Sequence, residues 1–418
     1  MSTAKAYVIG AGLAGLSASV ALAQAGFKVE LIESTGQAGG RCRSYFDATL
    51  GQVIDNGNHL VLSGNHATMK YLRIIGAEGA LAGPDNANAS FVDIRTGERW
   101  TIAPNDGPLP FWLFNTAKRV PGTRPADYFE LAKLLTAGPD RTIGDVLSCK
   151  GPLWERLLQP FFLAALNTQP EIGSAALAAK LFRETFAKGG RAYRPRIANP
   201  TLAAAFVDPA LRYLGQTHAR LRLGERLRRI VLDTARVTAL ETAEQMIALG
   251  HNDVVVLATP PWVTGELLPD IKVPDAFSAI VNAHFKVAPP PRVHLMLGIL
   301  GGTAEWVFSF PDRISVTVSG ADRLIDMGRE ALADILWRDV ATVHGLPMAL
   351  PPWQIVKEKR ATFAATPAQV AKRAKPRTRW ANLLLAGDWT DTGLPATIEG
   401  TIRSGHRAAE LAIRRRTV

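Results

Sequence analysis

Residues 6–15 read AYVI and then GAGLAG, a short apolar run followed at once by a Gly-x-Gly-x-x-Gly turn. The apolar run predicts a buried strand, and the Ala- and Leu-rich stretch from Leu16 to Gln24 predicts a helix that ends before Gly26. A second apolar strand follows over residues 27–32, with Glu33 at its end. This succession of strand, glycine turn, helix, strand and acid predicts a dinucleotide-binding βαβ unit.

The glycines and the acid of this unit have separate tasks. We expect Gly10 to permit the tight turn, Gly12 to let the backbone approach a pyrophosphate, and Gly15 to let the helix pack closely on the strand. The helix N-terminus offers unpaired N–H groups to phosphates, and Glu33 can accept hydrogen bonds from a ribose with free hydroxyls, which favours FAD or NAD over NADP. The expected nucleotide contacts of this unit are Gly10, Gly12, Leu13, Ala14, Gly15, Glu33 and Ser34.

The composition of the 418 residues is that of a globular protein, with 47% hydrophobic and 20% charged residues. The net charge of +11 favours an anionic membrane surface or acidic ligands, and no nucleic-acid motif accompanies it, so we expect no nucleic-acid partner. Cys42 and Cys149 form neither a CxxC pair nor a Cys/His cluster. We therefore expect no metal site and no disulfide framework, which fits a reducing compartment.

The sequence also bears on the membrane. No uninterrupted apolar run reaches the roughly 18 residues of a spanning helix. The apolar stretch over residues 6–25 is interrupted by three glycines and lacks the features of a signal peptide. We expect a cytoplasmic protein that makes peripheral contact with the inner face of the cytoplasmic membrane.

Further motifs decide between FAD and NAD. Gly36 to Arg41 reads GQAGGR, which allows a second close backbone approach with a cation beside it, and Asp55 to His59 reads DNGNH after a strand-like segment. Near the C-terminus, the apolar strand over 382–386 ends in Gly387-Asp388. The segment GLPATIEG over 393–400 then leads into a helix. No other Gly-x-Gly-x-x-Gly follows a strand, so we expect no second, nicotinamide-binding unit.

These segments resemble the amine oxidase and phytoene desaturase superfamily of FAD enzymes. The resemblance implies that Asp388 contacts the flavin chain, that Thr397, Ile398 and Glu399 lie by the ring, and that the backbone of Leu227 meets the adenine. The further cofactor-binding residues that it implies are Gly39, Gly40, Arg41, Gly57, Asn58, His59, Leu227, Gly387, Asp388, Thr397 and Ile398.

The fold class that follows is α/β, with a discontinuous, Rossmann-like FAD-binding domain and an inserted α+β substrate domain, as in amine oxidases. The FAD-binding domain is expected to comprise residues 1–95, 218–265 and 378–418. The substrate domain is expected to comprise residues 96–217 and 266–377. Within it, Leu109 to Phe114 and Trp154 to Asn167 are strongly apolar. Each is either buried core, the wall of an apolar tunnel, or an interfacial segment that lies on a membrane.

A narrower resemblance is to the squalene-associated FAD flavoproteins of bacterial hopanoid pathways, the hydroxysqualene dehydroxylases. It rests on DNGNH over 55–59, on the segment from Pro160 to Asn167 with Ser174-Ala175 after it, and on GDWTDTGLPATIEG over 387–400. One departure is Asn58, where the family pattern has Gln. The resemblance implies a lipophilic isoprenoid substrate, hydroxysqualene, whose hydroxyl is removed reductively with hydride from reduced FAD, and an external electron donor of unknown identity.

The residues leave several alternatives open. A carotenoid-type desaturase would have the same apolar tunnel, an amine oxidase could use Lys286 near the flavin, and a non-catalytic isoprenoid carrier could retain FAD for structure. For a dehydroxylase, the catalytic candidates are His59, as an acid for the leaving hydroxyl, and Asn167, as a group that orients it. Glu399 could be an acid if buried, although its place at a helix start favours a capping or flavin-contact role.

Overall fold

The computed structural model describes residues 4–416 of the chain and confirms the βαβ unit. Strand β1 (Lys5–Ile9) is followed by helix α1 (Leu13–Gln24) and strand β2 (Lys28–Glu33), and the two strands pair in parallel. The helix begins three residues earlier than predicted, because the extended backbone of Gly12 ends the turn and Leu13 already has helical geometry. The N–H of Gly10 donates to Ile32 at 2.7 Å and holds the turn at the end of β2.

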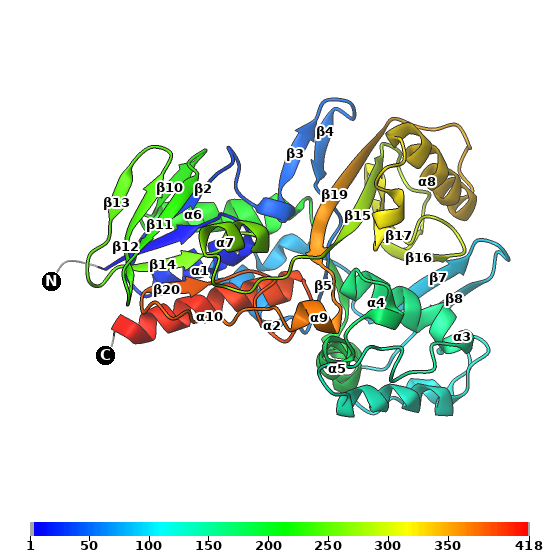
Figure 1. Cartoon of the computed structure of the whole chain (residues 1–418). Helices are drawn as coiled ribbons and strands as arrows, with labels where there is room; N and C mark the ends of the chain where they lie inside the picture. Colours follow the sequence, from blue (N-terminus) through cyan, green and yellow to red (C-terminus); the bar gives the residue numbers. More distant parts are fainter. Residues whose placement is uncertain (1–3, 417–418) are drawn as a thin grey trace.

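The strands of this unit belong to a five-stranded parallel sheet (Figure 1). Its order is β10 (Arg220–Leu223), β2, β1, β14 (Val254–Leu257) and β20 (Leu383–Leu385). Strands from three distant parts of the sequence therefore share one sheet, as the prediction of a discontinuous FAD-binding domain requires. The central strands are buried on both faces, which explains why they read as continuous apolar runs.

Two different layers cover this sheet. On one face, α1 packs against α10 (Ile398–Arg416) and α6 (Asp208–Gln216). On the other face lies a small antiparallel sheet of β11 (Leu227–Leu232), β12 (Val237–Thr242) and β13 (Met246–Ala248), whose Ile230, Val237 and Leu240 pack against Tyr7 and Ile9. Short helix α7 (Pro261–Leu267) follows β14.

The second part of the molecule is built on a seven-stranded sheet, seen at the right of Figure 1. Its order is β19 (Trp353–Phe363), β15 (Phe277–Phe285), β18 (Arg313–Val318), β17 (Trp306–Phe310), β16 (Met296–Leu300), β7 (Ala89–Asp93) and β8 (Arg99–Ile102). Helix α8 (Arg329–His344) packs on one face. The aromatic side chains of the other face pack against the helical run from Gly151 to Leu166, which contains α3 (Gly151–Leu153), η5 (Trp154–Leu158) and α4 (Gln159–Leu166).

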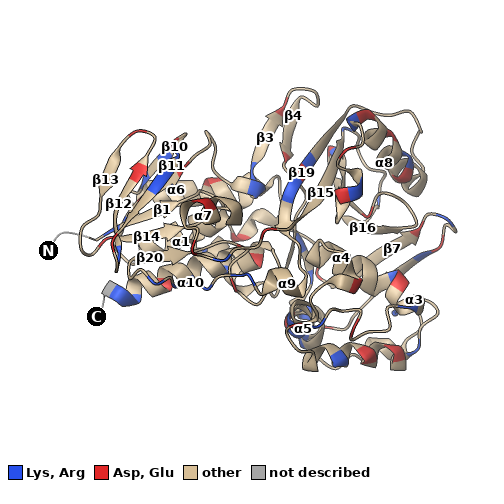
Figure 2. Ribbon diagram, viewed as in Figure 1, with Lys and Arg blue, Asp and Glu red and all other residues tan. Residues whose placement is uncertain are grey.

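The remaining elements are short. They are η1 (Gly40–Cys42), β3 (Ser44–Asp47), β4 (Gln52–Asp55), β5 (Leu60–Leu62), α2 (His66–Ile74), η2 (Glu78–Ala80), β6 (Leu81–Ala82), η3 (Phe111–Phe114), η4 (Pro125–Thr136), η6 (Pro170–Ile172), α5 (Ala175–Glu184), η7 (Phe186–Lys188), η8 (Gly190–Ala192), β9 (Pro195–Ala198), η9 (Ala203–Val207), η10 (Ala321–Leu324) and α9 (Pro367–Val370). Lys and Arg are scattered over both parts of the chain, with a small group at the end of α10 (Figure 2). Among the helices described, none combines the length and apolar character that a membrane span needs.

The domain limits stay a prediction, but two elements lie on the other side of the expected limits. Strand β7 lies before residue 95 but pairs with β16 in the seven-stranded sheet. There, the ring of Phe91 packs against the ring of Trp306. Helix α6 falls before residue 217 and yet packs on α1. A short connection joins β7 to β8 and another joins α6 to β10, so the sequence gave no signal of a domain boundary at these places.

The contact between α1 and α10 depends on Gly405. A Cβ at this position would overlap the Ser17 hydroxyl and the Ala14 carbonyl oxygen of α1. We therefore expect Gly405→Ala to push the two helices apart and lower the free energy of unfolding by about 1–3 kcal/mol, measured by urea denaturation. The matched control is Gly215→Ala in α6, where a Cβ meets no atom within 4 Å. It should stabilise by about 0.5–1 kcal/mol, and equal effects from both variants would contradict the close packing.

Candidate functional site

Packing within the protein requires glycine at two positions of the turn, Gly10 and Gly15, but not at Gly12. A Cβ at Gly15 would overlap the Gly10 carbonyl, and one at Gly10 (φ +101°) would lie 2.6 Å from the Ala258 carbonyl oxygen. A Cβ at Gly12, in contrast, would meet no atom within 4 Å. No side chain caps α1, so the first N–H groups, of Leu13 and Ala14, remain available. An open glycine beside an uncapped helix N-terminus fits a pyrophosphate.

The acid that ends β2 is held beside this turn. Glu33 accepts hydrogen bonds from the N–H of Ala11 at 2.8 Å and of Thr35 at 2.9 Å, and Ser34 donates to it at 3.3 Å. The segment that follows β10 also lies beside Glu33, as the hydrogen bond from the Glu225 N–H to the Glu33 carbonyl at 3.0 Å shows. This brings buried Leu227 to the end of β2, where the adenine half of a dinucleotide is expected.

The second glycine motif packs directly on the first. The N–H of Gly39 donates to Ala11 at 2.8 Å, and a Cβ at Gly40 would lie 3.3 Å from the Gly12 Cα. The guanidinium of Arg41 then donates to Asp388 at 2.7 Å and also to the Ala361 carbonyl. Burial disfavours the charge of Arg41, but the Asp388 carboxylate outweighs this and raises the pKa of Arg41 above its ordinary value. The structure thus joins the N-terminal motif to the C-terminal one.

Arg373, which the sequence analysis missed, holds the loop that contains Asp388. Its buried guanidinium donates to the carbonyls of Asp388 at 3.2 Å and of Trp389 at 3.3 Å and to the Thr392 hydroxyl at 3.1 Å. Burial lowers the pKa of Arg373 to about 10, so it is still charged at neutral pH. The residue lies within a run rich in Lys and Arg over 372–379, which on the sequence is typical of a solvated segment.

The start of α10 contains the three residues expected by the flavin ring. Thr397 caps the helix, since its hydroxyl accepts the N–H of Gly400 at 3.1 Å, and Ile398 is buried. Glu399 caps a different helix: its carboxylate accepts the N–H of Thr68 at 2.9 Å in the first turn of α2 and pairs with Arg403 at 2.7 Å. The Glu399 carboxylate thus ties the first turn of α2 to the start of α10, and its place by the flavin ring stays a prediction.

The DNGNH segment runs beneath the seven-stranded sheet. Gly57 lies against Asn282 of β15, with an added Cβ only 2.8 Å from the Asn282 amide nitrogen. Asn58 donates to the Thr317 hydroxyl of β18 at 3.1 Å, and Thr317 donates in turn to Asn282 at 2.8 Å. The Asn58 amide oxygen is buried and has no hydrogen-bond partner in the described part of the chain. This network joins the predicted flavin segment to the substrate sheet. No sequence motif indicated two of its members, Thr317 and Asn282.

The two catalytic candidates have different surroundings. His59 is half-buried next to Arg41, and burial together with that charge lowers the pKa of His59 to about 4. Burial and the neighbouring Arg41 charge thus favour the neutral imidazole of His59 at pH 7. Asn167 is buried, and its amide donates to Thr362 at 3.0 Å and to the Ser278 carbonyl at 3.2 Å and accepts the N–H of Gly320 at 2.7 Å. These contacts make Asn167 a tie between α4 and the sheet.

Glu305 is a titratable group that the sequence analysis overlooked. It is half-buried directly before β17, accepts the N–H of Ser319 at 2.7 Å, and burial raises its pKa to about 7. The next residue, Trp306, is paired in register with Thr317, which is paired with Asn282. Glu305 thus directly precedes Trp306, which belongs to the row that contains Thr317 and Asn282.

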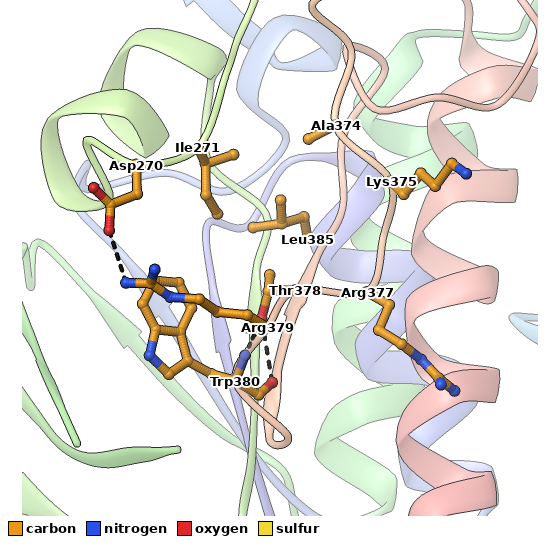
Figure 3. A pocket seen from close by; sticks show the side chains of 9 residues that line it. All are labelled: Asp270, Ile271, Ala374, Lys375, Arg377, Thr378, Arg379, Trp380 and Leu385. Atoms are coloured by element: carbon orange, nitrogen blue, oxygen red, sulfur yellow. Dashed lines mark hydrogen bonds and ion pairs between the residues drawn. The ribbon is translucent and has the colours of Figure 1, made fainter. Parts of the chain in front are cut away.

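Two other features lie apart from this site. Lys286 donates to the Leu50 carbonyl at 2.7 Å, in the β3–β4 hairpin. Figure 3 shows a pocket at the edge strand β20, where Arg379 stacks on Trp380 at 4.4 Å and pairs with Asp270 at 2.7 Å. None of the residues lining that pocket is a predicted cofactor or catalytic residue.

Comparison with known proteins agrees with this geometry. The model of the flavin containing amine oxidoreductase family matches residues 13–413, and the chain belongs to this family. It is an FAD-dependent oxidoreductase. The cyclohexylamine oxidase of Brevibacterium oxydans has the same fold, with a TM-score of 0.71 over 99% of both chains at 14% identity.

Three relatives are much closer in sequence. Proteins named hydroxysqualene dehydroxylase from Rhodopseudomonas palustris, Sinorhizobium fredii and Zymomonas mobilis are 52%, 50% and 48% identical to this chain. Each alignment covers 97% of this chain and 98% of the relative. The similarity therefore extends over both the FAD-binding sheet and the substrate sheet.

The open space at Gly12 can be tested by filling it. We expect Gly12→Ala to leave the fold of the apoprotein intact and to weaken FAD binding by about tenfold or more, because the methyl group takes the space of the phosphates. Circular dichroism and titration with FAD give the two readouts. Gly79→Ala is the control, since a Cβ there also meets nothing within 4 Å but lies far along the chain, and it should leave affinity unchanged. Unchanged affinity in Gly12→Ala would disprove the assignment.

Proposed function

We propose that this chain removes the hydroxyl of hydroxysqualene reductively to give squalene. The observation that carries the proposal is the identity of 48–52% over nearly the whole length to three proteins named for that reaction. The surroundings of Lys286 speak against an amine oxidase, because its amino group is bound to the β3–β4 hairpin. Nothing in the described structure favours a desaturase or a non-catalytic carrier.

The chemistry sets the tasks of the protein. The C–O bond of the substrate breaks and a C–H bond forms, so one hydride and one proton enter and water leaves. Reduced FAD supplies the hydride, and an external donor must return two electrons after each turnover. The chain itself must hold the cofactor, keep water from the reacting carbon and deliver the proton.

The cofactor would be held by the residues assembled above. We propose that Gly12 and the N–H groups of Leu13 and Ala14 bind the phosphates, that Glu33 binds the ribose, and that Arg41 with Asp388 positions the flavin chain. His59 and Asn58 would lie beside the ring, with His59 neutral at pH 7 and able to orient the substrate hydroxyl by a hydrogen bond. Asn167 would contribute only by fixing α4 to the sheet.

Glu305 fits the role of proton donor. Burial raises the pKa of Glu305 to about 7, one of its oxygens accepts the N–H of Ser319, and the next residue, Trp306, belongs to the row that contains Thr317 and Asn282. In contrast, His59 is almost wholly deprotonated at that pH. A protonated carboxyl is the kind of group that turns a hydroxyl into a leaving water molecule.

We propose, further, that the protein works peripherally at the cytoplasmic face of the inner membrane. A long isoprenoid dissolves in the bilayer rather than in water. Both cysteines are free, which is compatible with a reducing compartment.

The reaction can be tested in a single anaerobic turnover. FAD-loaded protein is reduced with dithionite and mixed with hydroxysqualene, while flavin absorbance and squalene mass are followed. We expect stoichiometric reoxidation of the flavin and one squalene per flavin. Protein that holds FAD but gives no reoxidation would refute the proposal and direct attention to the oxidised enzyme with polyenes and amines.

The same assay tests the proton donor. Because the acid form of Glu305 is required, the wild-type rate should fall as pH rises through about 7. Glu305→Gln keeps the acceptor for Ser319 and should lower the rate about a hundredfold while removing this pH dependence. The control Glu330→Gln, on the exposed start of α8, should change neither. An unaltered rate and profile in Glu305→Gln would exclude Glu305.

A further inference from the structure

The apolar segment after β8 is divided between core and surface. Trp112 and Leu113 are buried, whereas Leu109, Phe111 and Phe114 are 62%, 67% and 71% exposed. In η4, the neighbouring stretch, Phe129 is 67% exposed beside buried Tyr128. Three phenylalanines and a leucine with most of their surface in water are costly in isolation, since each exposes apolar area that folding usually removes.

The two stretches form one rigid unit. The buried rings of Trp112 and Tyr128 meet edge to face with centroids 5.5 Å apart. Arg119 donates to the Leu113 carbonyl at 2.8 Å and to the Thr123 carbonyl at 2.9 Å. The exposed side chains are therefore presented on a fixed backbone, with η4 at the lower edge of the molecule under α5 in Figure 1.

The charges around these side chains favour an anionic partner. Residues 105–136 and 183–194 together contain eight Lys and Arg and four Asp and Glu. The two segments adjoin, because the N–H of Gly190 donates to the Asn105 carbonyl at 2.9 Å and Arg194 pairs with Asp106 at 2.8 Å. Exposed aromatic side chains on segments with an excess of basic residues suit a bilayer surface, which offers acyl chains and anionic headgroups.

A group of four aromatic rings lies beside the segment that contacts Asn105. Phe186 lies 5.2 Å from Tyr193 and 5.2 Å from Phe161 between ring centroids, and 6.2 Å from Phe182. These four side chains are only partly buried. They connect the loop beside Asn105 to α4, and Asn167, which follows α4, is hydrogen-bonded to the substrate sheet.

We propose that Leu109, Phe111, Phe114 and Phe129 insert into an anionic bilayer and that the adjoining aromatic rings receive the isoprenoid from it. This inference rests on the proposed function for the identity of the lipid, but the insertion itself does not. The partner to which we commit is the bilayer. A second copy of the chain is the competing occupant, and the experiment distinguishes the two.

The test measures partition of the FAD-loaded protein onto vesicles of phosphatidylglycerol and phosphatidylcholine by sedimentation. The triple variant L109S/F111S/F114S should reduce partition about tenfold or more, and F129S should reduce it by a smaller factor. The matched control F46S/V53S removes two exposed apolar side chains from the β3–β4 hairpin, at the opposite edge of the molecule in Figure 1, and should retain wild-type binding. Added salt should weaken binding of every variant.

Activity on detergent-dispersed hydroxysqualene separates the two proposals. It should be equal in wild type and triple variant, whereas activity on vesicle-borne hydroxysqualene should fall with partition. Loss of partition with no turnover by any variant would refute the dehydroxylase and leave the membrane surface standing. Wild-type partition by the triple variant, an equal loss in F46S/V53S, or a wild-type dimer that the triple variant converts to monomer would each overturn the membrane surface.

Discussion

The ion pair between Arg41 and Asp388 joins parts of the chain that are almost 350 residues apart in sequence. On one side, Arg41 extends from a glycine turn that is packed on the phosphate turn after β1. On the other, Asp388 follows the edge strand β20 of the same sheet, in a loop held by the buried guanidinium of Arg373. Asp388 is buried and Arg41 is its charged partner, so the ion pair stabilises the two segments in contact with each other. Because Arg41 also donates to the Ala361 carbonyl in β19, the same side chain joins the two glycine motifs to the substrate sheet.

The sequence was most informative where one physical requirement acts on few residues. A turn that must approach phosphates needs glycine, and an uncapped helix must follow it, so the βαβ unit and the parallel sheet were predictable from local spacing. The return of residues 220–223 and 383–385 to the same sheet was predictable only through the family resemblance. The helix start at Leu13 was missed because leucine carries no starting signal of its own, whereas the extended backbone of Gly12 supplies one.

The parts of the site that were not predicted depend on contacts between distant segments. Arg373 appears in the sequence as one cation among several, and only the carbonyls that converge on it reveal its task. Thr317 and Asn282 are ordinary strand residues until Asn58 lies against them. Glu305 acquires its neutral-range pKa from burial, which no local pattern encodes. Conversely, His59 and Asn167 had the right chemistry by type, but burial made the first a neutral group and hydrogen bonding made the second a fixed one.

Because Glu399 caps α2, the order in which the chain is synthesised affects how the N-terminal part folds. The first turn of α2 lies near residue 66, but the Glu399 carboxylate that caps it belongs to the last twenty residues of the chain. Helix α10, which packs on α1, lies at the same end of the chain. A ribosome therefore releases almost the entire chain before its N-terminal nucleotide fold can close. Until then the early strands lack β20 and α10, and the apolar surface that these elements cover stays exposed. Cofactor capture is accordingly an event of the finished chain, and loss of even a short C-terminal piece would strike the N-terminal half.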